Sequence, residues 1–498
     1  MTVLSLIVFL PLAAAVVLGA ARALPDAVSR WAWLGVTVAE LVLVGVLVAG
    51  YDTPPDGGLA WEQRLRWIPS VNSSYHVGVD GLSLPLVALT AVVFCACAVH
   101  ALKDARRPRA QAALFLFLQA TCLGLFVAQD LILFFVFFDL SIVGMYFVIA
   151  GWGHGGAARS ALKFFLYTFL GSLALLVGFI GLYLAADPHT FDIPELVAAA
   201  PLADDAVAGA WVLGAILLGL AVKTPTVPFH TWLPPAHTDA PAIGSAVLAG
   251  ILLKMGTYGF VRIAMPALPG AWQAWAWVVL TVGVVSVLYG ALVALAQTDV
   301  KRMIAYTSVN HMGYVLVAVG AAGVVADGAR EARELAVTGA VTQMVSHGLI
   351  TSALFLLAGV LHDRAGSYAM ADFGGLAAPA PRYAGLFAVG AFASLGLPAF
   401  SGFVAEFQIF AGSIGATWFA VLAVPGILLT AALFLRAYQR LFTGPTVGRA
   451  EGFPDLRTHE LLPVGGLLLL SLLIGVVPWP LLDLIAPAAE TVVGLVSR

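Results

Sequence analysis

Two lysines lie inside apolar stretches where neither a soluble core nor a lipid-facing helix usually holds a charge. Lys223 is in ILLGLAVKTPTVPF and Lys254 is in SAVLAGILLKMGTYGF. An ammonium at the centre of a bilayer costs roughly 2.5 to 3.5 kcal/mol on insertion scales, so each lysine must face protein or water. The pair therefore indicates a path for ions or protons.

Other ionisable side chains in apolar segments extend this pair to a series. A proton relay needs such a series, because every member must take up and release a proton, and a lysine does so near neutral pH only where burial destabilises its charged form and a carboxylate lies close. The alternative is that a pair such as Asp139 and Lys223 is a buried ion pair that only fixes helix packing. The number of members favours the relay. Besides the two lysines they are Asp139, His311, His347 and Glu406, with Asp299 to Arg302 near the start of the segment that holds His311.

The elements that must hold these residues are membrane helices. Hydrophobic residues make up 61% of the chain and charged residues only 10%, and the mean hydropathy is +0.98, which excludes an ordinary soluble domain. Runs long enough to cross about 30 Å of hydrocarbon recur almost end to end. We predict an all-α polytopic membrane protein with about 14 transmembrane helices. The expected spans are 2–22, 31–50, 83–102, 110–127, 130–151, 161–186, 207–228, 241–265, 274–297, 302–322, 334–361, 384–413, 416–442 and 461–489.

Charge placement orients these spans. Most of the Lys and Arg residues fall in the loops after helices 1, 3, 5, 7, 9, 11 and 13, among them Arg22, Arg106, Arg107, Lys301 and Arg440. The positive-inside rule puts this side in the cytoplasm and both termini on the outer side. The acidic loop 187–206, which has no Lys or Arg, then lies outside, where we expect its carboxylates to be solvated.

Two predicted helices are interrupted at matching places, as in transporters built from inverted repeats. Helix 7 breaks at Pro225 and Pro228 and helix 12 at Pro398, because proline cannot continue the backbone hydrogen bonds of a helix. If helices 4 to 8 and 9 to 13 are two five-helix units, the break falls in the fourth helix of each. Because each unit has an odd number of helices, the second unit crosses the membrane in the opposite orientation to the first. The predicted units are 1–105 (helices 1 to 3 with an outer loop), 106–268 (first repeat), 269–445 (second repeat) and 446–498 (helix 14).

Five long motifs resemble the antiporter-like proton-pumping subunits of respiratory complex I, and the similarity runs over nearly the whole chain. Within that family the M-type (chain 4) branch has a glutamate at the helix 12 position where the L-type subunit and the antiporter subunits have a lysine, and this chain has Glu406 there. The motifs are AVKTPTVPFHTWLPPAHTDAP, LAGILLKMGTYGFVR, TDVKRMIAYTSVNHMGYVL, VSHGLITSALFLLAGVLHDR and SLGLPAFSGFVAEF.

The resemblance implies a role for each member of the series. Lys223 would be the central pumping lysine and Asp139 its carboxylate partner in helix 5. Lys254 would connect two half-channels, His347 would continue the relay, and Glu406 would be the terminal site. The histidine of VNHMGY, His311, would border the cytoplasmic half of the path.

Helix 5 departs from the family pattern. Relatives usually have a glutamate followed five residues later by a proline, whereas this chain has Asp139 and Gly144. Aspartate is one methylene shorter, which reduces its reach by roughly 1.5 Å, and glycine removes a kink. We therefore expect a looser or water-mediated pairing between Asp139 and Lys223.

The implied function is that of a proton-translocating membrane subunit of a complex I type NADH-quinone oxidoreductase, and so a translocase subunit without a redox site of its own. NADH, FMN, iron-sulfur clusters and quinone are expected in partner subunits, because this chain shows no dinucleotide motif and its Cys95, Cys97 and Cys122 lack metal-type spacing. Expected partners are L-type and N-type neighbours and lipid, without nucleic acid, in a bacterial-type inner membrane. The alternative function is a subunit of a multisubunit Na+/H+ antiporter.

Overall fold

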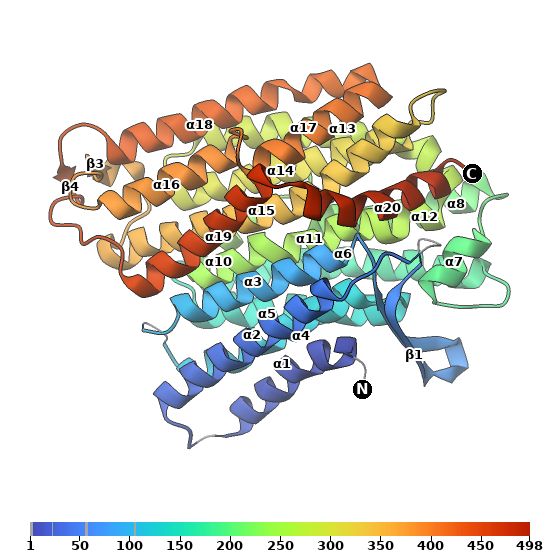
Figure 1. Cartoon of the computed structure of the whole chain (residues 1–498), viewed down its shortest axis with the longest axis horizontal. Coiled ribbons are helices and arrows are strands. Elements are labelled where there is room, and N and C mark those ends of the chain that lie inside the picture. The colour runs from blue at the N-terminus through green and yellow to red at the C-terminus, as the bar shows by residue number, and fades with distance from the viewer. Residues whose placement is uncertain (1–2, 22, 55–57, 104–105) are drawn as a thin grey trace.

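The computed structural model describes residues 3–21, 23–54, 58–103 and 106–498. The other residues of the predicted unit 1–105, among them Arg22 of the orientation pattern, lie outside this description, as do both ends of the predicted span 2–22. In the described part, nearly all regular structure is helical, and the helices form one bundle with a common long direction (Figure 1). Twelve helices of that part are long and apolar enough to cross a membrane. The prediction of an all-α polytopic membrane protein is confirmed.

The helices of the first half alternate in direction across the bundle (Figure 1). Their bounds are α1 Val3–Ala20, α2 Asp26–Ala49, α3 Leu84–His100, α4 Pro108–Val127, α5 Leu131–Trp152, α6 Ala157–Ala185, α7 Ile193–Ala199, α8 Ala206–Lys223, α9 Leu233–Asp239, α10 Ala242–Val247, α11 Leu253–Gly259 and α12 Met265–Ala267.

The second half continues the bundle with longer helices. Their bounds are α13 Pro269–Ala296, α14 Val300–Gly323, α15 Arg330–Ala365, α16 Pro381–Ser394, α17 Ser401–Ala416, α18 Pro425–Phe442, α19 Thr458–Val476 and α20 Trp479–Val496. Four short strands lie at the ends of the bundle: β1 Ala60–Ile68 pairs antiparallel with β2 Ser73–Val79, and β3 Phe373–Gly374 pairs antiparallel with β4 Val447–Gly448.

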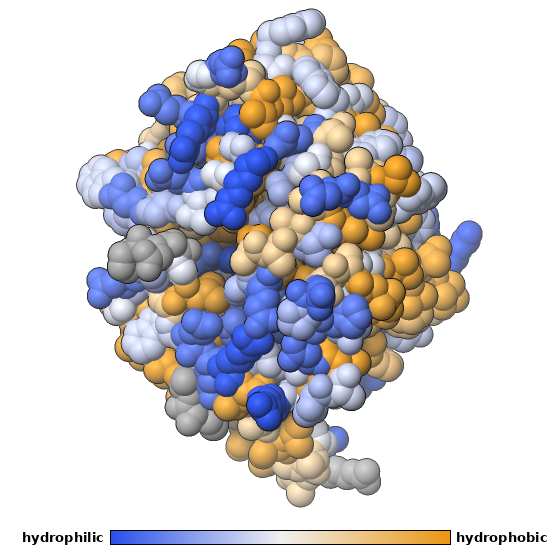
Figure 2. All heavy atoms as spheres, turned by 90° about the vertical axis from the view of Figure 1, so that its right-hand side faces the viewer, coloured by the Kyte–Doolittle hydropathy of each residue, from blue (hydrophilic) through white to orange (hydrophobic). Residues whose placement is uncertain are grey.

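The two ends of the bundle differ. The β1–β2 hairpin, α7, the start of α1 and the end of α20 lie together on the right of Figure 1, which we call the hairpin end, and β3–β4 lie at the opposite end. Viewed from the hairpin end, hydrophilic residues cover much of the middle of the surface and hydrophobic residues gather at its flanks (Figure 2). This pattern is typical of the aqueous end of a membrane bundle whose sides contact lipid.

Two crossings are interrupted where the prolines predict it. α8 ends at Lys223, two residues before Pro225, and helical structure resumes only at α9. α16 ends at Ser394 and α17 begins at Ser401, with Pro398 between them. A proline in a helix interior removes a hydrogen bond and clashes with the preceding turn, so each crossing becomes two half-helices. Lys223 is thereby placed at a helix end inside the bundle.

The crossing from α10 to α12 is continuous but not uniformly α-helical. Two π-helical turns, Leu248–Leu252 and Phe260–Ala264, flank α11, which carries Lys254. π-turns widen the helix and leave backbone carbonyls outside the regular hydrogen-bond ladder. Nearly all residues of this crossing and of the central helix α15 are buried. These two enclosed crossings hold Lys254 and His347, and the equally buried α14 holds His311.

The last predicted span, 461–489, is two helices in the structure. α19 and α20 follow one another end to end across the bundle, and they meet at Val477 and Pro478 (Figure 1). Pro478 cannot continue the hydrogen bonds of α19, which therefore ends before it. At the start of α20 a proline is accepted, because the first N–H groups of a helix make no hydrogen bond within that helix. Hydropathy alone did not separate the two, because each is apolar.

Candidate functional site

Lys254 and His347 form the centre of the site. Nζ of Lys254 lies 2.6 Å from Nδ1 of His347, and it also donates to the carbonyl oxygen of Ala249 at 2.5 Å. Ala249 precedes the lysine by five residues and lies in the first π-turn. Nε2 of His347 is 3.2 Å from the hydroxyl of Ser308 on α14. The lysine is thus fully buried in a polar setting made by its own helix, α15 and α14.

Two further residues continue the site. Glu406 is on α17, the second half of the crossing that is broken at Pro398, and His311 is on α14. Nε2 of His311 donates to the carbonyl oxygen of Ser394, the last residue of α16, at 3.1 Å and lies 3.9 Å from Oε1 of Glu406. The rings of His311 and His347 are 5.4 Å apart between centroids. The side chains of His311 and Glu406 are both buried. The helix break thus brings a backbone carbonyl and a carboxylate to the same imidazole.

A small cavity of about 10 Å³ lies among these side chains. It is lined by His311, His347 and Glu406 and by Gln343, whose Oε1 has no hydrogen-bond partner among the described residues. A volume of roughly 10 to 15 Å³ holds one water, which needs two or more polar partners. The cavity therefore has the size and lining to hold a water between the histidines and the carboxyl group.

Gly396 lets the carboxylate of Glu406 approach the broken segment. Its backbone has φ +77°, a conformation that side chains rarely adopt, and a Cβ added there would lie 2.5 Å from Oε2 of Glu406. Glycine is the residue that satisfies both conditions at once.

Gly396→Ala is therefore expected to displace the carboxylate and to cost about 1 to 3 kcal/mol through the left-handed conformation. If Glu406 binds and releases a proton, as its place in the predicted series implies, proton pumping through this chain should fall. Gly385→Ala on α16 is the matched control, because its added Cβ meets nothing within 4 Å. Equal pumping by both variants would show that the approach of Glu406 to Gly396 is not needed.

Lys223 lies apart from this group. Its Nζ donates to the hydroxyl of Ser141 at 3.0 Å and is 4.7 Å from the centre of the Phe138 ring, both on α5. Among the described residues no ion pair within 4 Å joins it to Asp139, which is partly buried and whose Oδ1 has no hydrogen-bond partner there. The lysine thus contacts α5 at the residue before the expected carboxylate and at the residue two positions after it.

The structure brings four of the six predicted residues together: Lys254, His347, His311 and Glu406. In the described part of the chain no hydrogen bond joins Lys223 to Lys254, but α8 and α11 pack closely, since a Cβ on Gly256 would meet Oγ1 of Thr224. In the part of the chain that the structure describes, no group of three or more His, Cys, Asp or Glu converges to hold a metal ion.

Comparison with known proteins places this site in a family. Residues 128–431 match the model described as NADH:quinone oxidoreductase/Mrp antiporter, TM, which spans both broken crossings and every one of the six residues. The chain belongs to this family. The family-matched region begins after α4, so α1 to α4 lie outside it.

Relatives in this family match along the whole chain. NADH-quinone oxidoreductase subunit M of Rhodobacter capsulatus is 39% identical, over 98% of this chain and 96% of its own. F(420)H(2) dehydrogenase subunit M of Methanosarcina mazei is 36% identical, over 99% of each chain. A chain of respiratory complex I from Thermus thermophilus has a TM-score of 0.89 at 30% identity and 99% coverage of each chain. A chain of the Mrp complex from Dietzia, at 22% identity and TM-score 0.84, shares the fold.

The residues that sequence reasoning missed at this site are hydroxyls. Ser141 and Ser308 bind Lys223 and His347 directly. A serine in an apolar helix gives little sequence signal, because its hydroxyl can bond a carbonyl of the preceding turn, as Ser141 does with Phe138 at 2.6 Å.

Lys301, in the Asp299 to Arg302 group, is fully buried and donates to the carbonyl oxygen of Ala240 at 2.5 Å.

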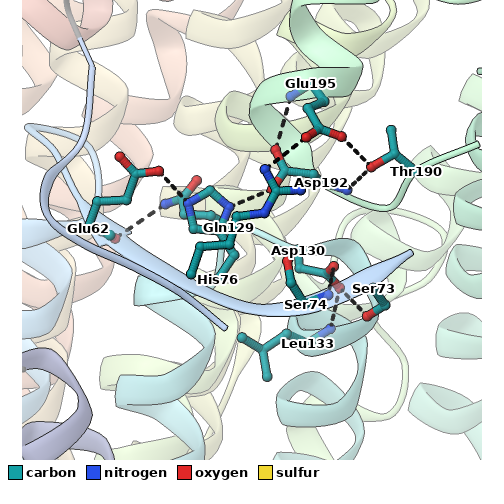
Figure 3. A network of polar contacts seen from close by, with 12 residues as sticks. Glu62, Ser73, Ser74, His76, Gln129, Asp130, Leu133, Thr190, Asp192 and Glu195 are labelled. Atoms are coloured by element: carbon teal, nitrogen blue, oxygen red, sulfur yellow. Dashed lines mark hydrogen bonds and ion pairs between the residues drawn. The ribbon is translucent and has the colours of Figure 1, made fainter. Parts of the chain in front are cut away.

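A second polar network lies at the hairpin end (Figure 3). His76 of β2 is placed between two carboxylates, with Nδ1 2.6 Å from Asp192 and Nε2 2.7 Å from Glu62. Arg64 of β1 contacts Glu195 at 2.8 Å and Asp192 at 3.4 Å. The expectation that the acidic loop 187–206 is solvated was wrong for Asp192, because the hairpin, which the sequence pattern did not reveal, covers it. Glu195 pairs with Arg64 but stays partly exposed.

The charge of His76 is expected to make this network sensitive to pH. Burial opposes the charged imidazole, but the hydrogen bonds and charges of Asp192 and Glu62 outweigh it and raise the pKa of His76 above its ordinary value. A raised folded pKa stabilises the folded state fully below about pH 6.5, and that contribution is lost as the pH rises through the raised value. The protection factors of the amides in strand β2, which are corrected for the intrinsic pH dependence of exchange, should therefore be higher at pH 6 than at pH 9. If His76→Gln shows the same dependence, His76 is not its source.

Proposed function

We propose that this chain is the M-type proton-translocating membrane subunit of a complex I type quinone oxidoreductase. The single observation that carries the proposal is the contact series from Lys254 through His347 and His311 to Glu406 within a family member that matches M-type relatives end to end. A glutamate at the second helix break distinguishes this series from one that ends in lysine.

The geometry supports proton exchange between Lys254 and His347 by a small displacement. A protonated lysine donates to Nδ1 while Nε2–H of His347 donates to Ser308. Transfer of the proton to Nδ1 leaves a neutral amine that accepts from the imidazolium, with both heavy-atom contacts kept. The second histidine and the small cavity offer the next acceptors on the way to Glu406.

Lys223 and Asp139 are proposed to form the first stage. Lys223 is buried at the end of a half-helix with only a neutral hydroxyl as hydrogen-bond partner, so its proton is not locked in an ion pair. Asp139 lies two residues before Ser141 on α5, and its Oδ1 has no hydrogen-bond partner among the described residues. Its approach to Lys223 would favour the protonated lysine, and its separation would favour release.

The assembly follows from the same proposal. We place both termini and the hairpin end on the outer side of a bacterial-type inner membrane, which agrees with the distribution of Lys and Arg. L-type and N-type subunits are the proposed neighbours, together with lipid, and the NADH, FMN, iron-sulfur and quinone sites belong to partner subunits. The units 106–268 and 269–445 are proposed as the two inverted repeats, each with its broken crossing.

A subunit of a multisubunit Na+/H+ antiporter is the second candidate, favoured by the fold shared with the Mrp complex. Purification of the native assembly in mild detergent separates the two. We expect quinone-site and iron-sulfur subunits to copurify with this chain. Copurification with small antiporter subunits alone would replace the first proposal by the second.

A further inference from the structure

A carboxyl group that the relay does not use lies in the middle of α2. Glu40 has no exposed surface, and neither of its carboxylate oxygens has a hydrogen-bond partner among the described residues. No cation pairs with it there. An unpaired carboxylate is too costly to bury in such a place, whereas a protonated carboxyl is tolerated. Glu40 lies outside the family-matched region 128–431 and is independent of the relay.

Three more buried side chains on α2 and α4 have polar atoms without hydrogen-bond partners among the described residues. α2, α3 and α4 lie side by side (Figure 1). On α4, both amide atoms of Gln119 and Oε1 of Gln111 have no hydrogen-bond partner in the described part of the chain, and on α2 the same holds for Nε1 of Trp33. All three residues are at most 4% exposed. Buried polar groups are rarely left unpaired, so this concentration needs a common explanation.

The helix register places these side chains in one row. The rings of Trp33 and Phe115 are 5.2 Å apart, which fixes the level of α2 against α4. The two helices run in parallel, because α3 returns the chain between them. At 1.5 Å per residue, Gln111 then lies about 6 Å before that level, Gln119 about 6 Å beyond it and Glu40 about 10 Å beyond it. Successive members of the row thus differ in level by about 4 to 6 Å along the helix axes, a spacing over which water can bridge polar groups.

At Gln111, the row meets a cavity at the end of the bundle opposite the hairpin. The cavity has a volume of about 360 Å³ and is lined by Gln111 together with His100, His154, His362 and the exposed Arg106. It therefore reaches the aqueous surface and offers several groups that bind protons. The row leads from this cavity to the middle of the membrane-spanning part of α2.

We propose that Glu40 is a protonated carboxyl that exchanges its proton with the cavity through the polar row of Gln119, Trp33 and Gln111. In the exchange, the O–H bond of Glu40 breaks, the proton passes to water in the row and on to the cavity, and the carboxylate takes a replacement proton by the same route. Glu40 is thus a second proton-binding site, in the N-terminal helices that precede the antiporter-like region.

Infrared difference spectroscopy of the purified assembly tests the proposal. The wild type should show the C=O band of a protonated carboxylic acid, shifted in D₂O, and Glu40→Gln should lose one component of it. Asp26→Asn, at the exposed start of the same helix, is the matched control and should keep that component. Gln119→Leu should keep it too but slow its deuterium shift several-fold. An unchanged band in Glu40→Gln, or an unchanged rate in Gln119→Leu, would overturn the proposal.

A second measurement needs no variant. A hydrophobic carbodiimide adds to protonated carboxyl groups within a membrane: the carboxyl oxygen bonds to the carbodiimide carbon and the proton moves to nitrogen. Mass spectrometry of the labelled native chain should find an adduct at Glu40 and none at Asp26. Absence of the Glu40 adduct under conditions that label another buried carboxyl would contradict a protonated Glu40. Because neither readout depends on pumping, failure here leaves the proposed function of the chain intact.

Discussion

Replacing Lys254 with methionine is expected to slow proton transfer through this chain by roughly 100-fold or more, because a positioned proton carrier is removed. Methionine has a similar length and no charge, so His347 loses its 2.6 Å partner without a large cavity being formed. Removal of a buried charge in favour of an apolar group is often neutral for stability. The assembly should therefore form, and proton pumping driven by quinone reduction should fall.

Lys254→Arg separates the need for a charge from the need for proton exchange. Arginine keeps the positive charge and the donors but does not release its proton in proteins. We expect this variant to pump as poorly as Lys254→Met. Pumping by the arginine variant close to that of the wild type would mean that Lys254 acts as a fixed charge and not as a carrier.

Glu406→Gln is expected to have an effect of similar size, roughly 100-fold on the transfer step. Glutamine keeps the shape and the hydrogen-bonding capacity of the side chain beside Gly396 and His311, but it cannot bind and release a proton. Pumping should fall while the assembly stays intact. The measurement is proton movement in vesicles at a matched rate of quinone reduction.

Glu334→Gln is the matched control for this variant. Glu334 forms an ion pair with Arg330 at 2.7 Å at the start of α15, and such surface pairs contribute little to stability. Pumping by this control should equal that of the wild type. If Glu406→Gln also pumps normally, Glu406 is not a proton site of the path.

The membrane architecture could be predicted from the sequence because its signals are local. Hydropathy locates the crossings, and Pro225 and Pro398 locate the breaks, since proline acts on its own helix whatever its neighbours are. The junction at Val477 and the β1–β2 hairpin were missed. The hairpin has no alternating apolar pattern, because β1 is largely exposed and β2 largely buried.

The contacts within the site were harder to predict, because they depend on three-dimensional packing. The buried charges could be listed as a series, but the sequence does not give the distance from Lys254 to His347, which is set by how α11 packs against α14 and α15. The contact of Lys223 with Ser141 in place of Asp139 follows from the direction in which α5 faces α8. Glu40 was missed because one acidic residue in an otherwise ordinary apolar run resembles an interfacial charge.

The most direct test of proton translocation by this chain uses Lys223→Ala. The assembled complex is reconstituted in vesicles, and protons moved per electron delivered to quinone are measured at equal quinone reduction, with Lys163→Ala on the exposed face of α6 as the control. We predict a lower proton-to-electron ratio for Lys223→Ala and an unchanged ratio for Lys163→Ala. An unchanged ratio in Lys223→Ala would contradict the relay.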